Sequence, residues 1–87
     1  MVEKTVKITD KAGVHARPAA KLLQLASSFN ETVTLSYLDK TIDFKSILGL
    51  MSLAIPYQAE VTLRVEGENE EEVLEKLIQG MKDLGLA

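Results

Sequence analysis

Two kinds of hydrophobic periodicity alternate along the chain. Segments in which every second residue is apolar predict half-buried strands, and segments with apolar residues three and four positions apart predict amphipathic helices. The strand-like segments are residues 2–8, 32–37, 41–44 and 60–66, and the helix-like segments are residues 16–28, 47–53 and 70–84. Their order along the chain is therefore βαββαβα.

Each segment offers a single apolar face, which has to be buried against another element. The expected helical core residues are Ala19, Leu22, Leu23, Ala26 and Phe29, then Leu50 and Leu53, then Val73, Leu74, Leu77, Ile78, Met81 and Leu84. The economical packing is an α+β open-faced β-sandwich, a four-stranded, mostly antiparallel sheet with the three helices on one face. Because no linker, repeat or low-complexity stretch interrupts the pattern, we expect residues 1–87 to form one domain.

Turn and cap residues mark several element ends. Asn69 is expected to cap the last helix, and the three glutamates that follow it suit the positive end of a helix dipole. Gly85 is expected to end that helix. Residues 38–40 predict a tight connection that joins the second and third strands as a hairpin.

Composition and charge narrow the class of protein. The 87 residues are 46% hydrophobic, which is enough for one core, and there is no cysteine for a disulfide or a thiolate metal site. A single histidine makes a zinc site improbable, so no metal and no cofactor is expected. The net charge of −3 argues against nucleic acid or an anionic membrane as the main partner.

No segment of the chain reads as a membrane or export element. No apolar run approaches the roughly 20 residues that a membrane helix needs. The first residues lack the basic and apolar regions of a signal peptide. We therefore expect a cytoplasmic protein without membrane insertion.

The start of the first helix carries residues that local electrostatics disfavours. His15 and Arg17 stand where unpaired N–H groups and the helix dipole already create positive potential. Proteins tend to break such local rules at functional sites, and a bound anion would resolve the conflict. The alternative is that His15 is merely exposed or structural, as most single histidines near helix starts are, and the residues alone leave both interpretations open.

A phosphoryl group is the anion that suits this arrangement best. A neutral imidazole nitrogen is nucleophilic near neutral pH, because an unperturbed histidine titrates near 6.5. Arg17 could then stabilise the oxygens of the phosphoryl group during in-line transfer.

Two longer motifs carry a resemblance to a known family. The run GVHARPAA, from Gly13 to Ala20, resembles the active-site signature of the histidine-containing phosphocarrier proteins, HPr, of the bacterial sugar phosphotransferase system. The run KSILGLMSL, from Lys45 to Leu53, resembles the regulatory serine segment of that family. The two lie at the family's spacing, and the resemblance extends over essentially the whole chain.

The resemblance implies a carrier rather than an enzyme. His15 would accept a phosphoryl group from enzyme I and donate it to the A domains of sugar-specific enzymes II. Arg17 would lie beside the phosphoryl group, and Pro18 would start the helix. Phosphoserine regulation at Ser46 would involve a dedicated kinase/phosphorylase and a catabolite-control regulator. From the residues alone, Ser46 is as well explained as the N-cap of a short helix.

The resemblance also implies a docking face around His15. On the first helix it would comprise Ala20, Gln24 and Ser27, which share the side of Arg17, and on the second Ile47, Leu48 and Met51. Leu50 and Leu53 are interpreted as core. We expect a monomer that meets its partners transiently.

The chain departs from the family pattern at a few positions. The family commonly has methionine at the position of Leu48, a polar residue at that of Leu25, and glycine at that of Ala54. The turn at residues 56–58 also lacks the usual glycine, so partner preference could differ.

Two rival functions remain. The first is a regulator of the same family that uses only Ser46. The known regulatory paralogue resembles the chain at Ala54 but lacks a histidine at the active position, so His15 argues against it. The second is a small α+β ligand-binding or assembly domain, which would leave the cationic helix start unexplained.

Overall fold

Four antiparallel strands and three helices make up the chain. The computed structural model describes all 87 residues. The elements are β1 (Val2–Lys7), α1 (Ala16–Ser27), β2 (Thr32–Tyr37), β3 (Lys40–Asp43), α2 (Ile47–Ser52), β4 (Glu60–Glu66) and α3 (Glu70–Asp83). Their order confirms the βαββαβα order and the α+β open-faced sandwich predicted from the sequence.

The sheet has the strand order β1-β4-β2-β3, and every pairing is antiparallel. Strand β4 is central, with Val65 opposite Val2 on one side and opposite Val33 on the other. This register places the apolar residues of the strands on one buried face. The other face is polar, with a Thr5–Thr62 hydroxyl pair at 2.8 Å. The sheet is therefore open to water on that side.

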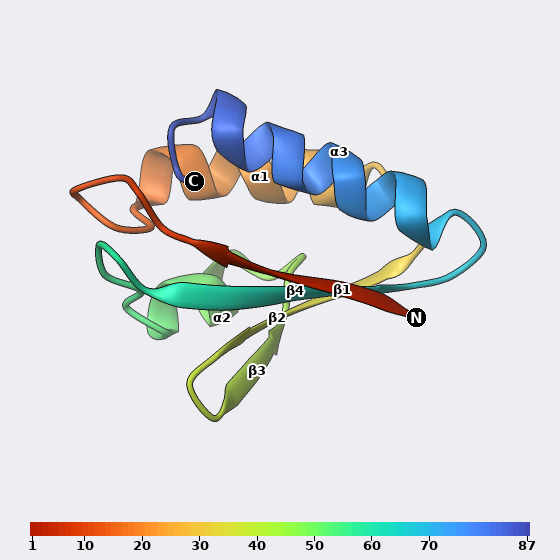
Figure 1. Cartoon of the computed structure of the whole chain (residues 1–87), viewed down its shortest axis with the longest axis horizontal. Coiled ribbons are helices and arrows are strands. Elements are labelled where there is room, and N and C mark those ends of the chain that lie inside the picture. Colours follow the sequence, from red (N-terminus) through yellow and green to blue (C-terminus); the bar gives the residue numbers. More distant parts are fainter.

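Helices α1 and α3 lie together across the apolar face of the sheet (Figure 1). The short α2 contacts α1 and the edge strand β3. The core contains 21 hydrophobic residues and no polar one. It includes Leu50 and Leu53, as predicted, whereas Phe29 and Leu84 pack against it only partly buried.

Leu25, the extra apolar residue of the first helix, lies against α3. A Cβ atom at Gly80 would come within 2.8 Å of Leu25 Cδ2. The small residue of α3 therefore makes room for the large one of α1. The packing of α1 against α3 thus explains why position 25 is apolar in this chain.

The β2–β3 hairpin is tighter than predicted. Tyr37 pairs with Lys40, so only Leu38 and Asp39 connect the strands, and β3 begins one residue earlier than the apolar pattern indicated. Leu38 adopts a φ of +57°, which the sequence did not indicate. Phe44, predicted as the strand's last residue, follows β3, but it is fully buried and its N–H donates to the Val33 carbonyl at 3.0 Å.

The capping role predicted for Asn69 is only half right. Asn69 occupies the N-cap position of α3, but its side chain forms no capping hydrogen bond. Its backbone N–H instead donates to Glu31 Oε2 at 3.1 Å. That bond is the main reason that the pKa of the Glu31 carboxyl lies below its ordinary value. A contact from the α1–β2 connection therefore holds the start of α3.

Replacing Ala54 with glycine is expected to stabilise the fold. Ala54 follows the last cap residue of α2 with a φ of +49°, a conformation that glycine commonly adopts at this position. Its Cβ costs about 1–2 kcal/mol there, which exceeds the entropic cost of glycine. We expect the free energy of unfolding in urea to rise by about 1 kcal/mol. Ala12→Gly, in an exposed loop without a positive φ, is the control and should not stabilise; an equal gain there would contradict the explanation.

Candidate functional site

The loop before α1 is held against the segment that follows α2. Gly13 adopts a φ of +71°, and its N–H donates to the Asp10 carbonyl at 2.8 Å. A Cβ at Gly13 would collide with the Ile55 carbonyl oxygen. That same oxygen accepts the Val14 N–H at 3.0 Å. Glycine is therefore needed here for both conformation and close approach, and the loop delivers the chain into α1 at a defined angle.

His15 is the N-cap residue of α1. This agrees with the sequence, which predicts that the helix begins at residue 16. Its backbone is extended (φ −107°, ψ 169°), and its carbonyl accepts the first helical hydrogen bond from Ala19 N–H at 3.1 Å. The imidazole forms no capping bond. The side chain is 45% exposed, so a ring nitrogen is accessible to a partner's group.

Asp10 is a neighbour of His15 that sequence reasoning missed. Its Oδ2 lies 3.2 Å from His15 Nε2, and its Oδ1 accepts the Ala12 N–H at 2.9 Å. The Ala12 bond first, and His15 second, hold the pKa of the Asp10 carboxyl below its ordinary value. A signal was present, because an aspartate two residues before a loop N–H is typical of an Asx turn. Only the folded loop shows that the turn reaches the imidazole.

Arg17 is the cation of the first turn of α1. It is exposed and takes part in none of the ion pairs of the structure. No acidic residue is present in that turn. The guanidinium, the dipole and the unpaired N–H groups therefore add up to a positive helix start.

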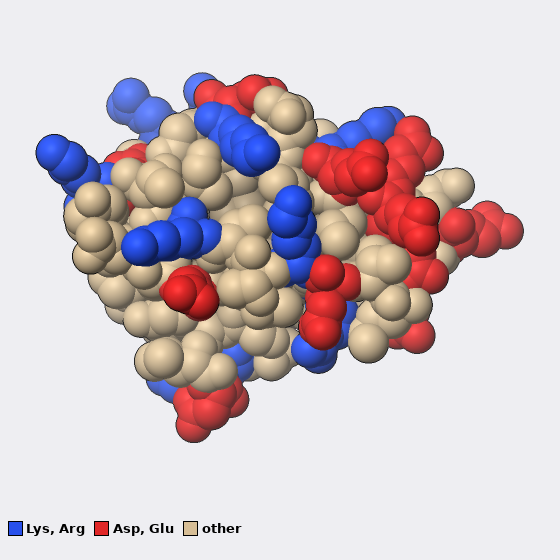
Figure 2. Space-filling model, viewed as in Figure 1, with Lys and Arg blue, Asp and Glu red and all other residues tan.

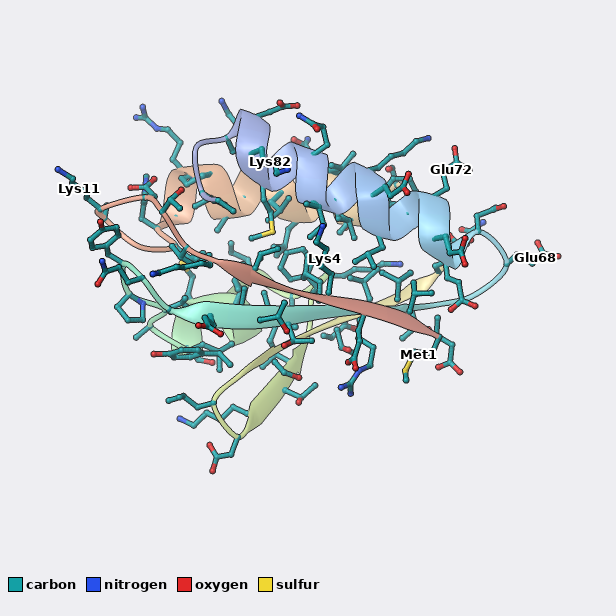
Figure 3. The ribbon with its side chains drawn as sticks, viewed as in Figure 1. Met1, Lys4, Lys11, Glu68, Glu72 and Lys82 are labelled. Carbon is teal, nitrogen blue, oxygen red and sulfur yellow. The ribbon has the colours of Figure 1, made fainter.

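The charge of the whole chain is distributed unevenly. Acidic side chains gather at the end of the molecule where α3 begins (Figure 2). Glu68 and Glu72 lie at that end, and Lys11, in the loop that leads to His15, lies at the opposite one (Figure 3). An approaching anion therefore meets less repulsion at the His15 end than the net charge of −3 suggests.

Ser46 caps α2, as one of the two interpretations of the sequence predicted. Its Oγ accepts the Gly49 N–H at 3.1 Å, and its carbonyl accepts the Leu50 N–H at 3.1 Å. The residue is only partly buried. Capping therefore explains Ser46 structurally, and part of the residue's surface remains exposed.

The residues predicted to form a docking face lie on two helices that contact each other. Leu48 is 81% exposed and Ile47 39% exposed, whereas Met51 is half-buried against the core. The α1 residues of this face, Ala20, Gln24 and Ser27, are all exposed. Arg17 starts the same stripe, because positions three and four apart share a helix face. No partner chain is present, so docking itself stays a prediction.

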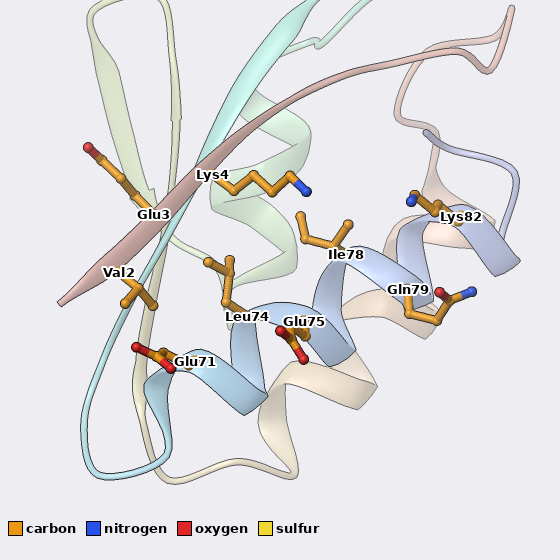
Figure 4. A pocket seen from close by; sticks show the side chains of 9 residues that line it. All are labelled: Val2, Glu3, Lys4, Glu71, Leu74, Glu75, Ile78, Gln79 and Lys82. Atoms are coloured by element: carbon orange, nitrogen blue, oxygen red, sulfur yellow. The ribbon is translucent and has the colours of Figure 1, made fainter.

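Two hollows lie elsewhere on the surface. The larger one, of about 490 Å³, lies between β1 and α3 and includes Val2, Leu74 and Ile78 among its lining (Figure 4). The other, of about 390 Å³, lies between the α1–β2 connection and the β4–α3 connection. Neither borders on His15, Arg17 or Ser46. The site at His15 is therefore an exposed surface rather than a cavity for a small molecule.

Two further features of the structure bear on function. Nowhere do three or more His, Asp or Glu side chains gather so that they could hold a metal ion. None of the helices combines the length and apolarity needed to cross a bilayer.

Comparison with known proteins identifies the family. The family model described as the PTS HPr component phosphorylation site matches residues 2–83. The histidine-containing phosphocarrier protein of Mycoplasma is 34% identical and superposes with a TM-score of 0.94, with 98% of this chain and 97% of that chain covered. The phosphocarrier protein HPr of Bacillus anthracis is 40% identical, with a TM-score of 0.85 and coverage of 91% and 94%.

A regulatory relative is also similar. Crh, the catabolite repression containing protein of Bacillus subtilis, is 44% identical with a TM-score of 0.75, and each chain is covered completely. Its crystal structure is described as a swapped, intertwined dimer, so the expectation of a monomer stays a prediction. The match over residues 2–83 and the likeness of the complete fold lead to one conclusion: the chain belongs to the HPr family, the phosphocarrier proteins of the phosphotransferase system, which carry phosphoryl groups and are not enzymes.

Proposed function

We propose that the chain carries a phosphoryl group on His15, accepts it from enzyme I and donates it to the A domains of enzymes II. The observation that carries the proposal is the exposed imidazole at a positive helix start. Arg17 adds a positive charge there and takes part in no ion pair. We place this exchange in the cytoplasm and propose that the carrier acts as a monomer.

The transfer needs little from the carrier beyond a nucleophile and positive potential. A ring nitrogen of His15 attacks the phosphorus atom as the bond to the donor breaks in line with it. The guanidinium of Arg17 and the N–H groups of the first turn stabilise the negative charge on the phosphoryl oxygens. An exposed site suits this task, because both donor and acceptor groups belong to other proteins.

The exposed α1 and α2 residues supply the contact with those proteins. The α1 stripe starts at Arg17, and the apolar α2 side chains Ile47 and Leu48 lie on the helix that packs against α1. A small surface with an apolar part fits partners that must bind and then separate. Met51 contributes its exposed part to the same surface.

Ser46 provides the regulatory input in this proposal. Phosphorylation by a dedicated kinase/phosphorylase adds roughly −1.5 to −2 charges at neutral pH, directly beside Ile47 and Leu48. A phosphoserine at the start of α2 faces the favourable end of a helix dipole, so the fold tolerates it. A catabolite-control regulator with a basic pocket would then recognise the modified form.

A second candidate function is regulation through Ser46 alone. The observation that favours it is the 44% identity to Crh over the complete chain. His15 and the free Arg17 have no task in that function, which is why we prefer the carrier. Incubation with phosphoenolpyruvate and enzyme I separates the two: a carrier acquires an acid-labile phosphoryl group, and a pure Ser46 regulator acquires none.

Ser46→Asp is expected to slow phosphoryl acceptance, whereas Ser46→Ala is not. Burying a carboxylate inside a small apolar interface is costly unless the partner pairs it. High salt should recover the part of the loss that comes from charge repulsion, because at 0.1 M exposed charges more than about 10 Å apart are largely screened. The initial rate of labelling by enzyme I is measured for both variants and the wild type at low and high salt.

The same variants carry their own structural control. Ser46→Ala removes the bond to Gly49 N–H and should cost about 1 kcal/mol of unfolding free energy, whereas Ser46→Asp keeps a capping oxygen. Ser46→Ala is therefore expected to be less stable than Ser46→Asp but to accept the phosphoryl group faster. If Ser46→Asp accepts phosphoryl as fast as the wild type at every salt concentration, Ser46 is only a helix cap.

A further inference from the structure

The contact between Asp10 and His15 distinguishes the two ring nitrogens. Asp10 Oδ2 lies 3.2 Å from His15 Nε2. The other carboxyl oxygen is already occupied by the Ala12 N–H at 2.9 Å. No hydrogen-bond partner is present at Nδ1, since the imidazole makes no bond to the helix N–H groups. One ring nitrogen is therefore engaged and the other is free.

The charge of Asp10 decides the direction of this bond. The pKa of the Asp10 carboxyl lies below its ordinary value, mainly because of the Ala12 bond. The carboxyl is therefore ionised at neutral pH and can only accept. In a neutral imidazole, one nitrogen carries the proton and the other a lone pair. A carboxylate next to Nε2 selects the tautomer with the proton on Nε2.

We propose that Asp10 is a positioning residue that holds the proton of His15 on Nε2 and so presents the Nδ1 lone pair to the incoming phosphorus. The inference deepens the proposed function of His15 and rests on it. The same logic applies where a buried aspartate orients the histidine of a hydrolase triad. Here the pair is exposed, so the effect is smaller.

The transfer step balances without any proton movement. The Nδ1 lone pair forms the new bond to phosphorus, and the bond from phosphorus to the donor breaks with its electron pair left on the donor. The Nε2 proton stays on the ring, which gains a positive charge at the moment of transfer. The Asp10 carboxylate, at hydrogen-bond distance from that proton, stabilises the charged ring.

Two substitutions at position 10 separate this role from a structural one. Ala12 N–H can only donate, so in Asp10→Asn the amide oxygen stays on Ala12 and the NH₂ group faces His15 Nε2. This donor favours the opposite tautomer, with the lone pair on Nε2. Asp10→Ala loses both bonds and favours neither tautomer. Asp10→Asn is therefore expected to accept the phosphoryl group more slowly than Asp10→Ala, although it preserves the loop better.

The experiment measures ring tautomer and phosphoryl acceptance in the same three proteins. The ¹⁵N chemical shifts of the two ring nitrogens are recorded by NMR for protein that contains ¹⁵N-labelled histidine. The pH is about 8.5, where an ordinary histidine is neutral. The rate of labelling by enzyme I with phosphoenolpyruvate is measured in parallel. We expect the Nε2 proton to dominate in the wild type and the Nδ1 proton to gain in Asp10→Asn. Acceptance should fall about tenfold in Asp10→Asn, the effect of reversing one hydrogen bond, and less in Asp10→Ala.

Each other outcome has a definite meaning. A purely structural Asp10 would leave Asp10→Asn close to the wild type and slow Asp10→Ala, and that order would overturn the proposal. Ring shifts that are the same in all three proteins would also overturn it. If the wild type itself accepts no phosphoryl group, the proposed function of His15 fails. If the wild type accepts the phosphoryl group but substitutions at position 10 leave the ¹⁵N shifts of the ring unchanged, only the proposed role of Asp10 fails.

Discussion

Replacing His15 with alanine is expected to abolish phosphoryl acceptance while leaving the fold intact. His15 is the only histidine of the chain, so no second imidazole can substitute for it. Its side chain is nearly half exposed and caps nothing, and its only hydrogen bond is the one to Asp10. An exposed pair of this kind contributes little to stability, so urea unfolding should change little. Labelling by enzyme I and phosphoenolpyruvate is the measurement.

The control for this variant is Ser46→Ala. It loses a real capping bond and should be less stable than His15→Ala, yet it should still accept the phosphoryl group. Loss of labelling in both proteins would point to a damaged fold. Undiminished labelling of His15→Ala would remove His15 from the reaction.

The charge reversal Arg17→Glu is expected to produce the second-largest effect. A carboxylate at this position repels the phosphoryl oxygens that the guanidinium should stabilise. Loss of one such stabilising group typically slows a reaction about 100-fold or more. Stability should be unchanged or raised by about 0.5 kcal/mol, because an acidic side chain suits a helix N-terminus. Transfer kinetics and urea unfolding of the same preparation test both statements.

A matched control separates local from overall charge. Lys40→Glu makes the same change in net charge at the exposed start of β3. If the two variants slow transfer equally, only the overall charge matters and Arg17 has no specific role. We expect Lys40→Glu to transfer at nearly the wild-type rate, with any difference removed by salt.

The sequence predicted the elements well because each buries a regular apolar stripe. Leu22, Leu77 and Leu63 are all buried, at positions that periodicity alone indicates. The order of the strands could not be read in the same way, because it depends on contacts between distant segments. Asn69 shows the limit: it occupies the N-cap position, but its side chain forms no capping bond, and the Glu31 carboxylate, distant in sequence, binds its backbone N–H.

The candidate site was predicted only in part, for a similar physical reason. His15 and Arg17 stood out because they break a local rule at a helix start. Asp10 was missed because its contact with His15 requires the intervening loop to turn back, held by the Ile55 carbonyl oxygen far along the chain. The positive φ angles of Ala54 and Gln58 are further features that the sequence did not predict. They depend on how elements meet, and residue types alone do not reveal them.

The residue that carries the phosphoryl group can be located directly. The wild-type chain is labelled with phosphoenolpyruvate and enzyme I, and the modified residue is identified by peptide mass spectrometry under alkaline conditions that preserve phosphohistidine. We expect one acid-labile phosphoryl group on the peptide that contains residue 15, and we expect this group to be transferred onward when an enzyme II A domain is added. An acid-stable label on Ser46, or no label at all, would contradict this expectation.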